Sequence, residues 1–283
     1  MRSSSEVCLD LSFDSIFAIE VRGDAIVRWG CWPLPPGSLR QGDPADPALI
    51  GGLVGEALRS SGFEAHAVRV TIADEAVVTR VLEVPAMPRR DLTRAAAFLA
   101  LKEVPIPIDK AAWAWDVVAS ADTANGVCLV ACWRDVVERL QAALVSAHLR
   151  PEVVEPRSFA LARALDMDSG IVLEAVGGAV RATVVAPGAP PYVEQVPLPL
   201  SGAERSQVIT GLQRRVIAQH AAAAGADLRP QTVLAGELQP DSIPGLQGMA
   251  ASQVLNGHKP RRPADLPVGF FLPAIGLAMR GRR

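Results

Sequence analysis

A short polar loop between two apolar runs is the first stretch of this sequence whose residues could do chemistry. The stretch is VCLDLSFDSIFAIEV, residues 7–21. Its first strand runs into Asp10, and the loop that follows carries Ser12, Phe13, Asp14 and Ser15. A loop at the end of a strand can cradle a phosphate, because its backbone N–H groups converge on the anion. Phosphate loops usually contain glycine, which lets the backbone approach the ligand closely. This loop has none, so two interpretations stay open: a nucleotide loop or an ordinary strand connection.

Other patterns that carry chemistry are not found in the sequence. The four histidines, at positions 66, 148, 220 and 258, are far apart and have no paired carboxylate at ligand spacing. The four cysteines form no CxxC pair, and three lie in apolar or aromatic runs typical of buried thiols. No Ser–His–Asp arrangement, HExxH motif or Walker loop is present. We therefore expect no metal site and assign no catalytic residue.

The composition is that of a globular protein. Of the 283 residues, 49% are hydrophobic and 20% are charged, which is enough apolar surface for a substantial core. A formal net charge of -2 gives no basic footprint for nucleic acid. The N-terminus lacks an apolar run of signal-peptide length, and no window reaches the ~18 apolar residues of a membrane span. We expect a cytoplasmic protein that reaches a membrane only through a partner.

The hydrophobic periodicity predicts three groups of elements. The first group has strands at 7–19 (interrupted by the loop above), 25–32, 67–73 and 76–84, and a helix at 48–61. The second has a helix at 88–104, strands at 112–118, 126–133 and 151–156, and a helix at 134–147, followed by a helix at 157–165. The third opens with a hairpin at 170–186 and continues with a strand at 192–200, a helix at 202–224, a strand at 232–238 and a final helix at 273–281.

The strand–turn–strand pattern that opens the chain returns at residue 170. One copy per half indicates two related lobes with a cleft between them. The predicted domains are residues 1–76 and 157–168 for the first lobe, 77–156 for an inserted strand–helix–strand–strand module, and 169–283 for the second lobe.

Five short stretches resemble the family of the pilus-assembly protein PilM, a branch of the actin-like ATPase superfamily that also includes the division protein FtsA. They are WPLPPGSL (32–39), LEVPAMPRRDL (82–92), KEVPIPIDK (102–110), RPEVVEPRSFALARAL (150–165) and AIGLAMRG (274–281). The resemblance implies an α/β, actin-like, two-lobed (ribonuclease H-like) fold with an inserted module. The family carries roughly fifty residues of lid between the second hairpin and the next helix; this chain goes almost directly into the helix, so a reduced second lobe is expected.

The resemblance also implies where a nucleotide would bind, and the motifs there are altered. Asp10 matches the first phosphate loop, whereas Ser12 replaces a glycine and bulky Phe13 follows it. In the second loop Glu174 takes the acidic place. The remaining positions of this implied site are Ser15, Gly177, Gly178 and Gly236. At the adenosine motif, Glu237 replaces the second glycine. We interpret the site as a relic without cofactor; the alternative is ATP with Mg²⁺.

The function implied by the resemblance is a non-catalytic cytoplasmic scaffold of a type IV pilus or type II secretion platform. It would bind the cytosolic N-terminal peptide of a PilN-like bitopic inner-membrane protein, with the assembly ATPase motor as a further possible partner. Two alternatives stay open: a nucleotide-dependent ATP-binding protein or ATPase of the same family, and an FtsA-like filament protein. Four apolar residues of the inserted module are candidates for the peptide contact, or else for its core: Trp113, Trp115, Val104 and Ile106.

Overall fold

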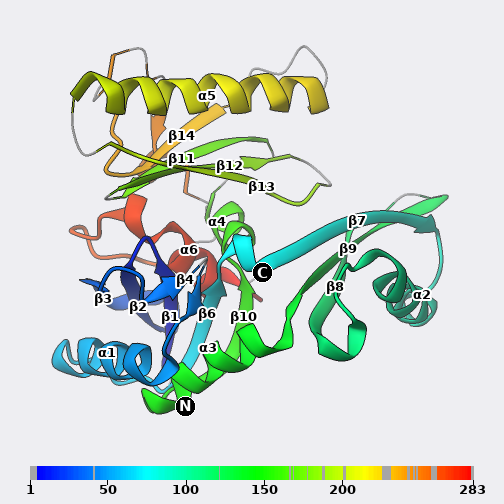
Figure 1. Cartoon of the computed structure of the whole chain (residues 1–283), viewed down its shortest axis with the longest axis horizontal. Coiled ribbons are helices and arrows are strands. Elements are labelled where there is room, and N and C mark those ends of the chain that lie inside the picture. The colour runs from blue at the N-terminus through cyan, green and yellow to red at the C-terminus, as the bar shows by residue number, and fades with distance from the viewer. Residues whose placement is uncertain are drawn as a thin grey trace.

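The computed structural model of the chain describes residues 5–40, 42–120, 122–165, 167, 169–176, 178–186, 189–199, 202–224, 231–240, 243–244, 246, 248–255 and 260–281. Figure 1 shows three parts: two stacked lobes and a module that projects sideways from the first lobe.

Each lobe is built on a five-stranded mixed sheet, and the two sheets have the same strand order. In the first lobe the order is β10 (Arg150–Pro156), β6 (Ala67–Ile72), β1 (Ser5–Ser12), β2 (Ser15–Arg22) and β3 (Ala25–Pro33). In the second lobe it is β15 (Met249–Ala250), β14 (Gln231–Gly236), β11 (Gly170–Val176), β12 (Ala179–Val185) and β13 (Tyr192–Pro197). In both sheets the first three strands are parallel and the last three antiparallel. The sequence prediction of two related lobes is confirmed.

Alternation along β1 and β11 decides which side chains face which layer, because successive strand residues point to opposite faces. Val7, Leu9 and Leu11 pack against helices α1 (Pro47–Ser60) and α3 (Arg134–Ser146). Ile171 and Leu173 pack against α5 (Gly202–Ala224).

The opposite faces of the two sheets share one core between the lobes. Cys8 of β1 and Val172 of β11 both belong to it, together with helices α4 (Arg157–Ala164) and α6 (Val268–Met279). At Gly276 of α6 an added Cβ would lie 1.7 Å from the carbonyl oxygen of Ala160, so the two helices cross in backbone contact. The layers therefore run α1 and α3, first sheet, α4 and α6, second sheet, α5 (Figure 1).

The inserted module is a three-stranded antiparallel sheet covered on one face by a helix. Its strand order is β7 (Val77–Pro85), β9 (Ala124–Trp133) and β8 (Ala111–Ser120), and the helix is α2 (Arg89–Glu103). Short elements complete the described fold: η1 (Asp74–Ala76), η2 (Ile108–Lys110), η3 (Ala251–Gln253), and the β-bridge pair β4 (Leu39–Arg40) and β5 (Asp43–Pro44).

Three elements lie elsewhere than the predicted boundaries place them. Residues 134–156, assigned from sequence to the module, form α3 and β10 of the first lobe, because α3 packs on α1 and β10 pairs with β6. Helix α6, assigned to the second lobe, lies in the shared layer and contacts β1, β2 and β6. Between β13 and α5 only residues 198–201 intervene, so no lid subdomain is inserted at this point.

Candidate functional site

The ends of the parallel strands determine where the polar residues of the cleft lie. β1, β6 and β10 are parallel, so their carboxyl ends meet at one edge of the first sheet, where loops carry ligand-binding residues in open α/β sheets. Asp10 lies near the end of β1, Thr71 near the end of β6, and Arg157 directly follows β10. Glu174 occupies the equivalent place on β11 in the other lobe. Asp10 lies two residues after Cys8 on β1, and Glu174 lies two residues after Val172 on β11. Side chains two residues apart on a strand point to the same face, so both carboxylates point into the layer between the lobes.

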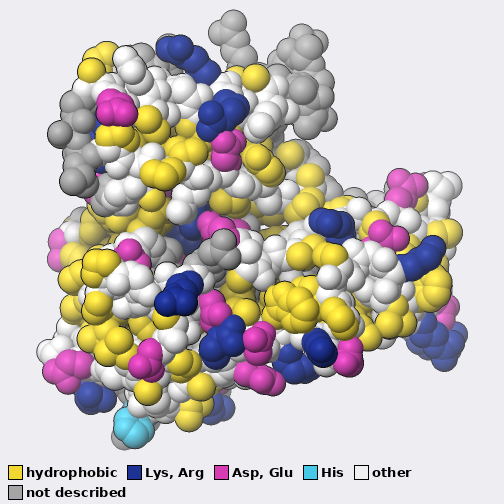
Figure 2. Space-filling view, in the orientation of Figure 1, with side chains coloured by type: hydrophobic (Ala, Val, Ile, Leu, Met, Phe, Trp, Pro, Cys, Tyr) yellow, Lys and Arg dark blue, Asp and Glu magenta, His cyan; other side chains and the backbone are white. Residues whose placement is uncertain are grey.

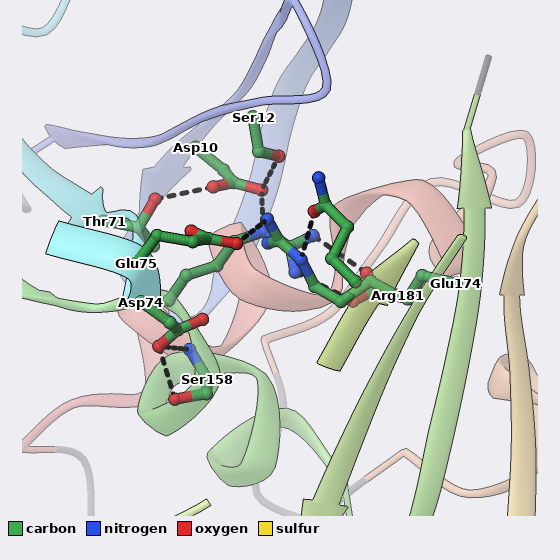
Figure 3. Close-up of polar contacts among 10 residues, drawn as sticks. Asp10, Ser12, Thr71, Asp74, Glu75, Ser158, Glu174 and Arg181 are labelled. Atoms are coloured by element: carbon green, nitrogen blue, oxygen red, sulfur yellow. Dashed lines mark hydrogen bonds and ion pairs between the residues drawn. The ribbon is translucent and has the colours of Figure 1, made fainter. Parts of the chain in front are cut away.

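One arginine joins the two carboxylates. Arg157 donates from Nη1 and Nη2 to the two oxygens of Glu174, both at 2.8 Å, and from Nε to Asp10 Oδ2 at 3.1 Å (Figure 3). The Asp10 carboxylate also accepts from the hydroxyls of Thr71 at 2.6 Å and Ser12 at 2.9 Å. A carboxylate from each lobe thus shares a single guanidinium.

This group of charges is buried. Asp10 is fully buried, and Arg157 and Glu174 are each 2% exposed. Burial lowers the pKa of Arg157, but the charges of Asp10 and Glu174 outweigh it and hold the pKa above its ordinary value. The guanidinium is therefore charged at every physiological pH, and both carboxylates are hydrogen-bonded. Any Mg²⁺ bound by Asp10 and Glu174 would have to displace Arg157 from them.

Phe13 fills the turn between β1 and β2. Phe13 and Asp14 have positive φ angles of 52° and 48°, a conformation that L residues adopt at some cost. The Phe13 ring lies 5.2 Å from the guanidinium carbon of Arg157 and 4.9 Å from that of Arg181, within the range of cation–π attraction. The loop in which the sequence raised the possibility of a phosphate thus presents an aromatic ring to two arginines. Ser15, beyond the turn, donates its hydroxyl to the Phe13 carbonyl at 3.2 Å.

Arg181 forms a second link between the lobes. It extends from β12, opposite Glu174, and donates to Gln195 at 2.9 Å and to Glu75 of the first lobe at 3.0 Å (Figure 3). Its Nη1 atom is buried and has no hydrogen-bond partner in the described part of the chain.

Asp74 lies beside this link at the start of η1. It accepts from the Ser158 backbone N–H at 3.1 Å and from its hydroxyl at 2.6 Å, whereas its Oδ2 is buried without a hydrogen-bond partner among the described residues. Burial raises the pKa of this carboxyl, opposed by the Ser158 hydrogen bonds and by the charges of Arg181 and Arg157.

A pocket of about 550 Å³ remains beside these groups, between the two hairpin turns. The first hairpin contributes Ser12, Phe13 and Asp14, and the second contributes Gly178 and Arg181. Asp14, Glu75 and Arg181 all line it, so the pocket is of mixed charge.

The remaining residues of the predicted nucleotide site are spread around the cleft. Gly236 ends β14 at φ +65°, and an added Cβ would lie 2.2 Å from the Ala175 carbonyl oxygen, so glycine is required there for strand packing. Glu237 follows it and pairs with Arg205 of α5 at 2.5 Å. Gly178 has open space around it. Gly177 lies outside the described residues.

The predicted partner-binding residues lie in the module. Val104 and Ile106 are 8% and 7% exposed, within the core beneath α2. Trp113 and Trp115 are partly buried and face the same core, and Arg89 of α2 lies over the Trp115 ring. These side chains thus help to hold α2 on the sheet, and a partner contact by them stays a prediction.

The most connected residues of the site were not singled out from the sequence. Arg157 lies inside RPEVVEPRSFALARAL, where it is the first residue of an amphipathic helix, and a solvated charge is the usual interpretation of that position. Arg181 carried a stronger signal, because it is the single charged residue of the strand AVRATVV. Thr71 lies near the end of the buried strand β6 and Asp74 two residues beyond it, which is where parallel sheets place their functional side chains.

The described residues contain no group of three or more His, Cys, Asp or Glu side chains placed to hold a metal ion. None of the helices described is long and apolar enough to cross a membrane.

Comparisons with known proteins agree with this architecture. Among solved structures, the chain is similar to a PilM–PilN type IV pilus biogenesis complex, with a TM-score of 0.72 and 19% identity over 98% of each chain. It is also similar to the cytoplasmic domain of EpsL, an inner membrane component of the type II secretion system of Vibrio cholerae, with a TM-score of 0.57 and 12% identity over 99% of this chain and 97% of that one. No curated protein matches the sequence.

A family model described as type IV pilus assembly protein PilM matches residues 9–185, more than half of the chain. With the two five-stranded mixed sheets, it confirms the predicted resemblance and the actin-like fold class. The chain belongs to the family of the type IV pilus assembly protein PilM and has the mixed α/β actin-like ATPase fold.

Proposed function

We propose that this protein is a nucleotide-independent cytoplasmic scaffold of a type IV pilus or type II secretion platform. The observation that carries the proposal is Arg157, which pairs with Asp10 of one lobe and Glu174 of the other inside the cleft. In the nucleotide site that the family resemblance implies, Asp10 and Glu174 would face the metal and the phosphates. Here Arg157 supplies the positive charge between the two carboxylates, so the two lobes are joined without a bound metal or nucleotide.

Titration calorimetry with ATP and Mg²⁺ tests this part of the proposal. We expect no binding at nucleotide concentrations up to the millimolar range, because a bound metal would compete with a buried guanidinium that pairs with both carboxylates. A dissociation constant in the micromolar range would overturn it.

One observation favours the alternative, nucleotide-dependent function. The pocket beside the hairpin turns is lined by Arg181, which is 4% exposed and has an unpaired Nη1. An anion in that pocket could pair with this atom. If the wild type binds ATP and Arg181→Ala abolishes the binding, the alternative is correct.

The second part of the proposal is a partner peptide. The solved structure similar to this chain is a complex of PilM with PilN, and we propose a PilN-like bitopic inner-membrane partner that is bound through its cytosolic N-terminal peptide. The module offers a surface for it on the sheet face opposite α2. The first cross-strand row on that face consists of Val77, Cys132 and Ala112, and these side chains pack on the first lobe.

The next row outward is Thr79, Val130 and Ala114, and these side chains are half-buried or exposed. An apolar strip therefore starts at the junction of the first lobe and the module and continues onto the open sheet. Figure 2 shows hydrophobic side chains gathered at this junction. Strand β8 is also an edge strand, to which an extended peptide can add by main-chain hydrogen bonds.

The test is calorimetry with a synthetic peptide that copies the cytosolic N-terminus of a bitopic protein encoded next to this one. Ala114→Glu on the open face of β8 should weaken binding at least tenfold, about 1.4 kcal/mol. Val145→Glu on α3, where the native side chain is 60% exposed, is the matched control and should leave affinity unchanged. Equal affinity for Ala114→Glu and the wild type would place the peptide elsewhere, and Trp115→Ala then tests the module face predicted from sequence.

A further inference from the structure

Helix α2 presents two large apolar side chains to solvent on the outer side of the module. Phe98 is 61% exposed and Leu101 is 64% exposed, in contrast to Leu92, Ala96 and Ala100, which are buried against the sheet. Phe98 and Leu101 are three residues apart, so they are neighbours on one helix face.

Basic residues share this face. At 100° per residue, Arg90, Arg94, Phe98, Leu101 and Lys102 fall within a sector of about 120°. Arg94 and Lys102 are exposed, and the Lys102 ammonium lies 5.9 Å from the centre of the Phe98 ring. Asp91 is the acidic residue of the sector, and it pairs with Arg90 at 3.4 Å. Arg94 and Lys102 therefore leave the face, which we call the α2 stripe, with a net positive charge.

The position and shape of the α2 stripe restrict what could cover it. In Figure 1, α2 lies at the end of the module farthest from the two lobes, and Figure 2 shows dark-blue side chains at that end. The stripe is a convex helix face, so it offers no groove into which a partner's helix could dock. Apolar side chains bordered by Arg and Lys on a convex helix match the chemistry of an interfacial amphipathic helix, which buries its apolar side among headgroups and pairs its cations with lipid phosphates.

We propose that the α2 stripe contacts a bilayer surface carrying anionic phospholipids, with Phe98 and Leu101 entering the headgroup region and Arg94 and Lys102 pairing with lipid phosphates. The stripe is on the covered side of the module sheet, opposite the strip proposed for the peptide, so both contacts can form at once. The contact is weak on its own, because each basic residue near an anionic surface strengthens partition about fivefold. The inference does not rest on the proposed function and can fail separately from it.

Vesicle cosedimentation of the full chain, without any partner peptide, tests the inference. The vesicles are phosphatidylcholine alone or with about one third phosphatidylglycerol. We expect binding to the anionic vesicles at low ionic strength, little binding to the neutral ones, and release as salt is raised. Phe98→Ser with Leu101→Ser should reduce the partition coefficient at least tenfold, and Arg94→Glu with Lys102→Glu should do the same.

Matched exposed positions provide the controls. Val145→Ser on α3 removes an apolar side chain that is 60% exposed, and Arg59→Glu on α1 reverses a charge whose side chain is 60% exposed. Both variants should bind vesicles as the wild type does. All the substituted side chains are exposed, so circular dichroism and thermal unfolding should match the wild type and exclude misfolding as the cause of lost binding.

Three outcomes would overturn the inference. The wild type could fail to bind anionic vesicles at low salt, which would point to a protein partner with an acidic surface for the stripe. The α2 variants could bind as well as the wild type, or the control variants could lose binding to the same degree.

Discussion

The two hairpins β1–β2 and β11–β12 occupy equivalent places in their sheets, yet they are held in different ways. Asp10 and Glu174 each lie two residues before the end of their first strand. Opposite Asp10 on the second strand is Phe17, and opposite Glu174 is Arg181. Asp10 is held by two hydroxyls and one nitrogen of Arg157, whereas Glu174 takes both terminal nitrogens of the same arginine.

The difference shows how two equivalent carboxylates, one in each lobe, form one asymmetric cross-link through a single arginine. A metal ion bound between the two lobes would come from outside the chain, and both carboxylates would share it. Arg157 comes from the first lobe, so its bonds to Asp10 stay within that lobe and its bonds to Glu174 are the ones that join the lobes. Arg181 crosses in the opposite direction, from the second lobe to Glu75. Each lobe thus contributes one arginine to the other.

The largest expected effect is at Arg157. Arg157→Met would leave Asp10 and Glu174 buried without their shared cation, and we expect a loss of about 3–5 kcal/mol in the free energy of unfolding. Urea unfolding measures it. Arg139→Met is the control, because Arg139 bonds to Asp43 and Asp135 but its side chain is 36% exposed, and its loss should cost about 1 kcal/mol or less. Equal losses in the two variants would show that Arg157 is no more than a surface ion pair in energetic terms.

The glycines of the second lobe give the next largest difference. Gly236→Ala forces an alanine into φ +65° and onto the Ala175 carbonyl, and we expect it to cost about 2–4 kcal/mol. Gly178→Ala meets nothing within 4 Å and should change stability by less than about 0.5 kcal/mol. Thermal unfolding of both variants checks the pair. Similar melting temperatures would mean that the contact between β14 and β11 relaxes enough to accept an alanine side chain at position 236.

Much of the fold could be predicted from sequence, because periodicity and turn chemistry are local. The repeated hairpin indicates two lobes, and the resemblance to the PilM family implies a phosphate-loop position for Asp10 in one lobe and for Glu174 in the other. The parity of Asp10 with Cys8 along β1 also determines that its carboxylate faces the shared layer.

What the sequence did not predict depends on contacts between distant parts of the chain. Arg157 is 147 residues from Asp10, and nothing in its own helix indicates that it turns into the cleft. Trp113 and Trp115 are two residues apart on β8, which places both rings on one face of the sheet, but which face α2 covers is decided by tertiary packing. The same packing leaves the α2 stripe exposed. Helical periodicity alone does not show whether its apolar residues, Phe98 and Leu101, are exposed or form a second buried face.

The turn of the first hairpin should show a smaller effect. Phe13→Ala keeps the positive φ but removes the ring between Arg157 and Arg181, and we expect a loss of about 1–2 kcal/mol in unfolding free energy. Asp14→Gly relieves a positive φ at an exposed residue and should be neutral or stabilise by less than about 1 kcal/mol. Urea unfolding of the two variants compares neighbours in the same turn. If Phe13→Ala were as stable as the wild type, the cation–π contacts would contribute nothing to joining the hairpins.

The smallest expected effect is a change in pH dependence at Asp74, beside the Arg181 link. Burial raises the pKa of Asp74 in the folded protein above its ordinary value of 3.8. At a pH between the ordinary and the raised pKa, the folded protein therefore binds more protons at this carboxyl than the unfolded chain does. Stability therefore falls as the pH rises through that window, and it is largest below it. Asp74→Asn cannot ionise, so its unfolding free energy relative to the wild type should increase as the pH rises, by about 1 kcal/mol or less. Ser158→Ala removes a hydroxyl that favours the carboxylate and should steepen the loss. Urea unfolding over a pH series measures all three proteins, and a wild-type profile parallel to that of Asp74→Asn would show that the arginines offset the burial of this carboxyl completely.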